Sequence, residues 1–160
     1  MSLKKKLLLI ALIIGILGAV FGIGAYNARS HTPPHTVAER FYRSWLDALK
    51  NGGDPLKEGL QHKSTYVTDT FAQEVDHLAK QGHDGVLCTG TQPKNFVLEA
   101  TALNKDGIHA SIDFVADGTN GHIVLARDMR GWWHIDEVDC PANAQEVPIG
   151  TTTATTSVVK

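Results

Sequence analysis

The sequence predicts an α+β domain behind an N-terminal transmembrane helix, with two or three helices packed on a curved four-stranded antiparallel sheet. Three observations support this fold class. An uncharged apolar run occupies Leu7–Tyr26. Apolar residues then recur at helical spacing as far as Gln81, and from Phe96 to Val138 they alternate with polar residues as in strands. Helices followed by consecutive antiparallel strands are typical of α+β folds.

The apolar run is long enough to cross a membrane as one helix. At about 1.5 Å per residue, a helix of about 20 residues spans the roughly 30 Å hydrocarbon core of a bilayer. Lysines occupy Lys4–Lys6 before the run, whereas Arg29 alone follows it closely. Because positive charge favours the cytoplasmic side, we expect a single-pass protein whose remaining residues are extracytoplasmic.

A cleaved signal peptide is the alternative interpretation of this run. Its apolar region is usually about 7–15 residues long and ends at small residues spaced A-x-A. The cleavage candidates near Gly24 and Ala28 match that pattern poorly, so we prefer an uncleaved anchor. Gly18 and Gly22 form a G-x-x-x-G pair through which two helices can self-associate, although glycine is common in membrane helices generally.

Composition divides the rest of the chain into a linker, one domain and a tail. The predicted parts are a cytoplasmic tip and anchor (1–28), a linker (29–35), a folded domain (36–140) and a disordered threonine-rich tail (141–160). About 100 residues suffice for one hydrophobic core but not for two. The net charge is −2. No basic patch with interleaved aromatic residues follows the anchor, which argues against a nucleic-acid partner.

The domain is expected to open with a helix over Val37–Asn51. Thr36 and Glu39 match a capping box at its start, and the glycines that follow Asn51 supply its end. Phe41 and Trp45 belong to an apolar stripe with a period of four residues, while charged residues occupy the other face. An aromatic stripe of this kind is more often core than ligand site.

The next part of the chain is predicted to be mainly helical and then irregular. A turn or short helical piece is expected at Asp54–Gly59, and a second helix lies within Ser64–Gln81, with Gly82 as its stop. The segment His83–Asn95 has no apolar period and contains Cys88. We expect an ordered loop that is held by a disulfide rather than by secondary structure.

Four antiparallel strands with tight turns are expected to complete the domain. The predicted strands are Phe96–Leu103, Ile108–Ala116, His122–Arg127 and Trp132–Val138. The predicted turns are Asn104–Gly107, Asp117–Gly121 and Asp128–Gly131. In the strand Ile108–Ala116 one face is expected to be buried and the other to be exposed to solvent.

The two cysteines, Cys88 and Cys140, both fall in the part that is predicted to be extracytoplasmic. In an oxidising compartment such a pair is most simply a disulfide. A bridge that closes a loop of about 50 residues stabilises by roughly 4 kcal/mol on the chain-entropy model. Two buried free thiols are the alternative.

The end of the domain carries a family resemblance. Gly131–Val138, GWWHIDEV, resembles the "G-x-W-k-I-d-d-I" closing strand of the nuclear-transport-factor-two-like superfamily. The domain also resembles a bacterial envelope family of unknown function within this superfamily. The resemblance lies in the order of elements, an opening helix with Phe41-Tyr42-x-x-Trp45, a loop with Asp84–Cys88 and a closing strand that ends in cysteine. The resemblance covers residues 37–140.

This resemblance implies a cone-shaped cystatin-like fold whose helices close over a concave sheet and sometimes leave an apolar cavity. Candidate pocket residues are Phe41, Trp45, Trp133 and Ile135. It also implies a bacterial inner (cytoplasmic) membrane location, with the domain on the extracytoplasmic side. It implies no reaction, because the superfamily hosts isomerases, dehydratases, transport factors and structural subunits.

Two function classes follow. The preferred one is a membrane-anchored extracytoplasmic binding or assembly module of unknown ligand, whose partner is another envelope protein or a second copy. The alternative is a small cavity enzyme of the isomerase or dehydratase type, with Asp113, His134 or Asp136 as its acid or base. All three alternate with apolar residues that are expected to face the core, which points them outward and favours the first class.

No motif for a metal or cofactor is found. The eight histidines show no H-x-x-x-H or H-E-x-x-H spacing on one predicted helix, and the cysteines form no C-x-x-C. There is also no G-x-S-x-G, phosphate-binding loop or dinucleotide fingerprint. We therefore expect neither a metal nor a cofactor, unless the fold brings distant histidines together.

Overall fold

The computed structural model of the protein describes residues 32–141. Within these residues no helix has both the length and the apolar character needed to cross a membrane. The expected membrane helix Leu7–Tyr26, its pair Gly18 and Gly22, and most of the threonine-rich tail lie outside the described residues. The anchor therefore stays a prediction from the sequence.

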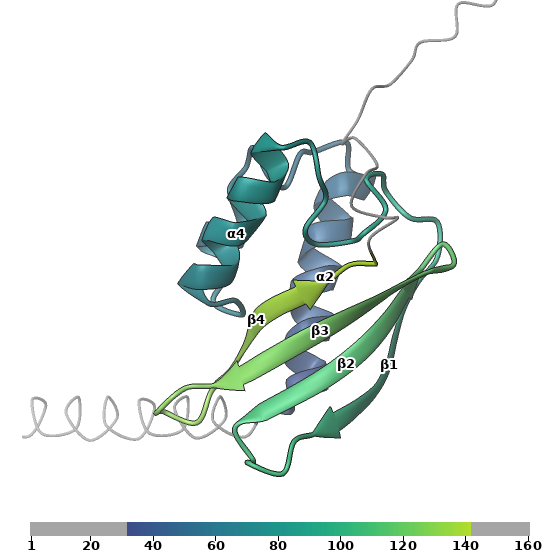
Figure 1. Ribbon diagram of the computed structural model, residues 1–160. Helices are drawn as coiled ribbons and strands as arrows, with labels where there is room; N and C mark the ends of the chain where they lie inside the picture. The colour runs from purple at the N-terminus through teal and green to yellow at the C-terminus, as the bar shows by residue number, and fades with distance from the viewer. Residues whose placement is uncertain (1–31, 142–160) are drawn as a thin grey trace, which may run out of the picture.

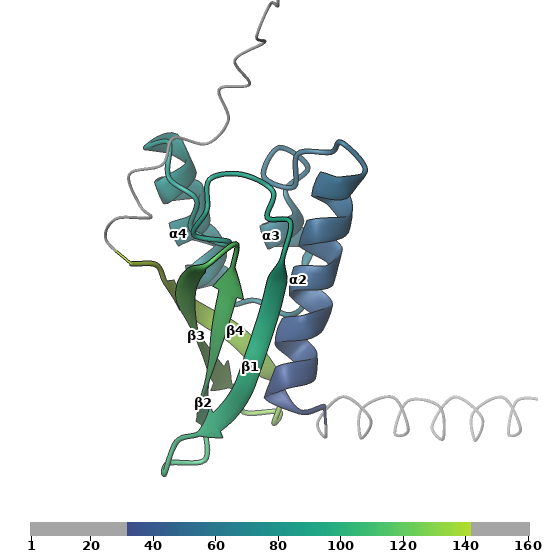
Figure 2. The same cartoon turned by 90° about the vertical axis from the view of Figure 1, so that its right-hand side faces the viewer.

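The described residues form three helices and one antiparallel sheet. The helices are α2 (Pro34–Lys50), α3 (Leu60–Lys63) and α4 (Asp69–Lys80), and the strands are β1 (Phe96–Leu103), β2 (His109–Ala116), β3 (Thr119–Arg127) and β4 (Trp133–Asp139). The strands pair in chain order, β1-β2-β3-β4. Both α2 and α4 pack on one face of the sheet, and no other described element covers the opposite face (Figures 1 and 2). The predicted α+β class is confirmed for this part of the chain.

Helix α2 begins earlier than the sequence suggested, at Pro34. Proline is favoured at the first helical position because its fixed φ suits the helix and its missing N–H would have no partner there. Pro33 is the N-cap, without a side-chain capping bond. The capping box predicted at Thr36 is therefore wrong, since Thr36 already lies in the first turn.

Helix α4 lies within the predicted range Ser64–Gln81 and leaves out the first residues of that range, because the chain there bonds to the sheet. Ile135 N–H donates to Tyr66 O at 2.8 Å, and Thr68 N–H donates to Ile135 O at 2.9 Å. Those backbone groups cannot also serve a helix. The helix starts at Asp69, and the hydroxyl of Thr68 accepts a 3.1 Å hydrogen bond from Phe71 N–H as its cap.

Aromatic side chains fill the space between α2 and the sheet. Tyr42 stacks on Phe96 with ring centroids 4.7 Å apart, and Phe96 lies 5.3 Å from Phe114. Phe41 and Trp45 are 2% and 3% exposed, so the predicted stripe of the first helix is indeed core.

Two details of the strands differ from a simple alternation. A bulge between Leu98 and Thr101 shifts the pairing of β1 with β2, so that Thr101 rather than Ala100 lies on the inner side. The turn between β2 and β3 is only Asp117-Gly118, both with positive φ, as a two-residue hairpin requires. The predicted five-residue turn is wrong, because its last three residues belong to β3.

The loop at residues 83–95 is irregular, as expected, and well held. Asp84 Oδ1 accepts hydrogen bonds from Val86 N–H at 2.9 Å and Leu87 N–H at 3.0 Å. The buried hydroxyl of Tyr42 donates to Val86 O at 3.0 Å. Cys88 and Cys140 form a disulfide with their Cα atoms 5.3 Å apart, which confirms the predicted bridge and excludes two free thiols.

We expect Trp45→Ala to lower the free energy of unfolding by about 3–5 kcal/mol, because truncation of a buried aromatic side chain leaves a cavity. Lys50→Ala, at an exposed position of the same helix, is the control and should change stability by less than about 0.5 kcal/mol. Urea denaturation of both variants measures this. Equal stability of Trp45→Ala and the unchanged protein would contradict the core assignment of this helix face.

Removal of the disulfide should cost about 4 kcal/mol, since the bridge closes a long loop of the unfolded chain. The double variant Cys88→Ser with Cys140→Ser and the reduced natural protein should lose the same stability in urea titrations. Mass spectrometry of non-reduced, exported protein should find no thiol that reacts with an alkylating reagent. Two reactive thiols in the folded domain would disprove the bridge.

Candidate functional site

The three predicted acid–base candidates lie apart from one another and outside the core. Asp113 on β2 is 64% exposed at its side chain, and its Oδ1 lies 2.6 Å from Nδ1 of His122. His134 on β4 instead faces Asp128, with 3.4 Å between His134 Nε2 and Asp128 Oδ2. Asp136 occupies the bulge at which the pairing of β3 with β4 shifts.

The four candidate pocket residues form two pairs, one on α2 and one on β4. Phe41 and Trp45 border a small hollow of about 240 Å³ beside α3. Trp133 and Ile135 are 8% and 0% exposed and belong to the core beneath the sheet. The side chains that the resemblance suggested for a cavity therefore serve mainly as packing.

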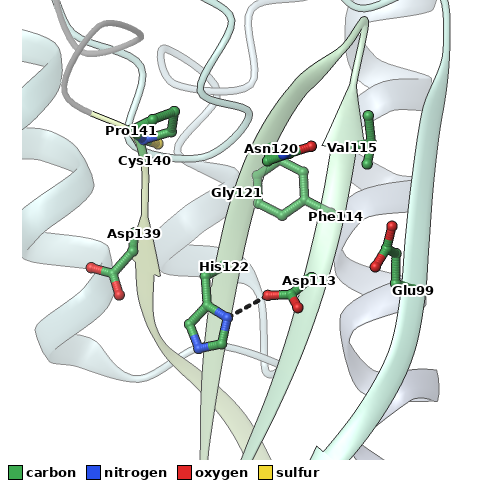
Figure 3. Close-up of a pocket in the computed structure, with 10 residues that line it drawn as sticks. All are labelled: Glu99, Asp113, Phe114, Val115, Asn120, Gly121, His122, Asp139, Cys140 and Pro141. Atoms are coloured by element: carbon green, nitrogen blue, oxygen red, sulfur yellow. Dashed lines mark hydrogen bonds and ion pairs between the residues drawn. The ribbon is translucent and has the colours of Figure 1, made fainter.

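A better candidate site lies on the uncovered face of the sheet. A pocket of about 450 Å³ lies there, and Figure 3 shows the residues that line it. Its lining residues are Glu99, Asp113, Phe114, Val115, Asn120, Gly121, His122, Asp139, Cys140 and Pro141. Three of these are carboxylates and one is a histidine, and they come from all four strands.

Strand register explains why these charges meet. Asp113 pairs with His122 across β2 and β3, and His122 pairs with Asp139 across β3 and β4. Residues directly opposite each other in antiparallel strands point to the same face. Glu99 continues the line on β1, beside the bulge. We call Glu99, Asp113, His122 and Asp139 the acidic row.

Further carboxylates extend the negative charge from the end of the acidic row towards α4. The pKa of Glu137 is raised above its ordinary value, chiefly by the negative charge of Asp139, with smaller contributions from burial and from Glu74 and Asp136. Like charges disfavour ionisation of a carboxyl group. This corner of the domain thus concentrates negative charge that a cationic ligand would relieve.

The chemistry of the acidic row favours binding over catalysis. The side chains of Asp113 and His122 are 64% and 41% exposed, so water screens the interaction between the two groups. Within residues 32–141 no three histidine, cysteine, aspartate or glutamate side chains are grouped to hold a metal ion. Carboxylates on an open face can instead pair with lysine or arginine side chains of a partner.

Sequence reasoning singled out Asp113 but missed His122, Asp139 and Glu99. The pairing of Asp113 with His122 depends on the length of the hairpin between them, and the sequence suggested a turn that was too long. A turn limited to Asp117-Gly118 would have placed His122 opposite Asp113, so the D-G dipeptide was the usable signal.

We expect Glu137→Gln to raise the free energy of unfolding at pH 7 by up to about 0.5 kcal/mol, the scale of an exposed charge interaction. Folding raises the pKa of Glu137, so ionisation costs stability as the pH rises through that pKa. The gain should disappear at about pH 3, because Glu137 of the natural protein is then protonated and, like glutamine, carries no charge. Glu58→Gln, at another exposed glutamate, is the control. A gain that persists at pH 3 would contradict this origin.

Comparison of the chain with models of protein families, with curated proteins and with solved structures finds no match. The resemblance of residues 37–140 to the nuclear-transport-factor-two-like superfamily therefore stays a prediction from the sequence. Any functional assignment of this chain has to come from its own residues and their geometry.

Proposed function

We propose that this chain is a membrane-anchored, extracytoplasmic binding or assembly module of the bacterial envelope. Its uncovered sheet face, centred on the acidic row, would hold a basic segment of a partner protein. The observation that carries this proposal is the position of the acidic row on a face that no described element covers.

The filled interior supports binding at the surface rather than catalysis in a cavity. A cavity enzyme needs a titratable group inside, with a shifted pKa, and hydrogen-bond donors for a developing oxyanion. The space under the sheet is instead occupied by Tyr42, Phe96 and Phe114, whose rings contact one another. Asp113, the most exposed of the proposed acids, faces water on the outer side.

The proposed location has two independent supports. The apolar run Leu7–Tyr26, with lysines before it, has the length and charge bias of a membrane helix that leaves the rest of the chain outside. The disulfide Cys88–Cys140 agrees with an oxidising compartment.

Site-specific photocrosslinking of the full-length protein in its own membranes tests the binding function. Ser111 lies on the same face, two residues before Asp113 on β2, so a photoreactive residue there should crosslink the partner. Asp113→Asn combined with Asp139→Asn should weaken the adduct roughly three- to tenfold, because each screened ion pair contributes up to about 1 kcal/mol. High salt should weaken it likewise.

The matched control removes two carboxylates elsewhere. Glu58→Gln combined with Asp69→Asn changes exposed acidic residues outside the sheet and should leave the adduct unchanged. An adduct that is insensitive to the acidic row and to salt would disprove recognition of a basic segment. Turnover of a small substrate that is lost in Asp113→Asn alone would favour the enzyme alternative instead.

A further inference from the structure

Exposed apolar side chains gather at two hairpin turns. Within residues 32–141 four large hydrophobic side chains are strongly exposed: Val97 at 57%, Leu103 at 65%, Ile108 at 52% and Met129 at 106%. Leu103 and Ile108 flank the turn between β1 and β2, and Met129 lies in the turn between β3 and β4. Both turns thus expose large apolar side chains to their surroundings.

The two turns lie at the same end of the domain. Both views place them beside the N-terminal end of α2 and opposite the loop at residues 83–95 (Figures 1 and 2). Arg127 N–H donates to Ile108 O at 2.8 Å, which joins the end of β3 to the first turn. We call the two turns, Leu103–Ile108 and Asp128–Trp132, the hairpin tips.

The chain also reaches the predicted membrane from this end. The apolar run ends at Tyr26, and the described domain starts at Thr32, next to the first turn of α2. Six residue steps span at most roughly 20 Å of extended chain. If the run crosses the membrane, the end of the domain that bears the hairpin tips is the one held against the membrane surface.

The polar groups of the hairpin tips suit a lipid interface. The guanidinium of Arg130 lies over the ring of Trp132, which is half-buried, at 5.6 Å from its centroid. Tryptophan is enriched at membrane interfaces. Lys105 adds a second exposed cation. The carboxylates of Asp106 and Asp128 accept hydrogen bonds from backbone N–H groups of their own turns, so they stabilise the turns.

We propose that the hairpin tips insert their apolar side chains into the headgroup boundary of the outer leaflet. This contact holds the domain upright on the membrane. The proposal rests on the anchored topology proposed above. The anchor keeps the tips at high effective concentration near the bilayer, so that even a few apolar side chains suffice for a stable contact.

If the domain stands upright, the acidic row lies at a fixed distance from the membrane surface. Strands of about eight residues are roughly 26 Å long, and the acidic row lies in the half of the sheet away from the hairpin tips (Figures 1 and 3). A partner would then meet the acidic row above the headgroups. The bilayer itself could not cover that face.

Fluorescence quenching by brominated lipids tests this contact with the full-length chain. The protein is reconstituted in vesicles of phosphatidylcholine and phosphatidylglycerol, with bromine near the headgroup end of the acyl chains. The reference chain carries Trp133→Phe, because Trp133 is the neighbour of Trp132 at the start of β4. In it we expect strong quenching that disappears when Trp132→Phe is added. Quenching should persist in Trp45→Phe, because Trp45 is buried and lies about 16 Å along α2 from its start.

A set of glutamine variants tests the apolar side chains. The triple variant Leu103→Gln, Ile108→Gln and Met129→Gln should reduce Trp132 quenching at least twofold. Val97→Gln is the matched control, since Val97 is equally exposed but lies at the other end of β1. It should leave quenching unchanged.

Flotation of carbonate-washed vesicles separates the two ways in which the proposal can fail. A chain that does not float with the vesicles has no anchor, which overturns both the topology and the tip contact. A chain that floats without Trp132 quenching, or whose quenching ignores the triple variant, overturns the tip contact alone. Protection of the tips from hydrogen exchange that rises with protein concentration, without quenching, would assign them to a second copy and overturn the lipid contact.

Discussion

The packing around Phe114 is the constraint on which most of this domain depends. Its ring lies over Gly121 so closely that a Cβ atom there would be 2.2 Å from Phe114 Cζ. The same ring contacts the rings of Tyr42 and Phe96, with centroid distances of 5.6 Å and 5.3 Å. Through these contacts one side chain of β2 joins β3, β1 and α2. The hydroxyl of Tyr42 donates a hydrogen bond to Val86 O and so connects this packing to the loop at residues 83–95.

This packing also explains where function can reside. Because rings occupy the interior between α2 and the sheet, the polar residues of the strands have only the outer face available. The same alternation that buries Ile112 and Phe114 exposes Asp113 between them. Pairing of β2 with β3 and of β3 with β4 then sets His122 and Asp139 beside it. The acidic row is thus a consequence of how the core is built.

The sequence was sufficient for features that depend on local patterns. The stripe of α2, the hairpin at Asn104–Gly107 and the bridge of Cys88 with Cys140 follow from periodicity, turn residues and cysteine count, and all three are present. It was insufficient where tertiary contacts override local preference. Ile135 takes the backbone bonds that would have extended α4.

The candidate site was harder to predict, because register depends on small local changes. The shorter hairpin at Asp117-Gly118 and the bulge after Leu98 each shift which residues share a face. A one-residue error in either place would exchange the inner and outer residues of a strand. Single residues such as Asp113 could therefore be placed from their neighbours, whereas the acidic row across four strands could not.

The disulfide also determines how tension would pass through the protein. Cys88 and Cys140 enclose all four strands in a covalent ring. A force applied between the N-terminal end of the domain and the C-terminus of the chain would pass from one sulfur to the other and bypass the sheet. The disulfide prevents the chain between the two cysteines from extending. At a sequence separation of 52, that chain would be about 170–190 Å long when extended. Pulling could therefore unfold only the helices, and a force on the C-terminal tail would leave the outer face of the sheet intact.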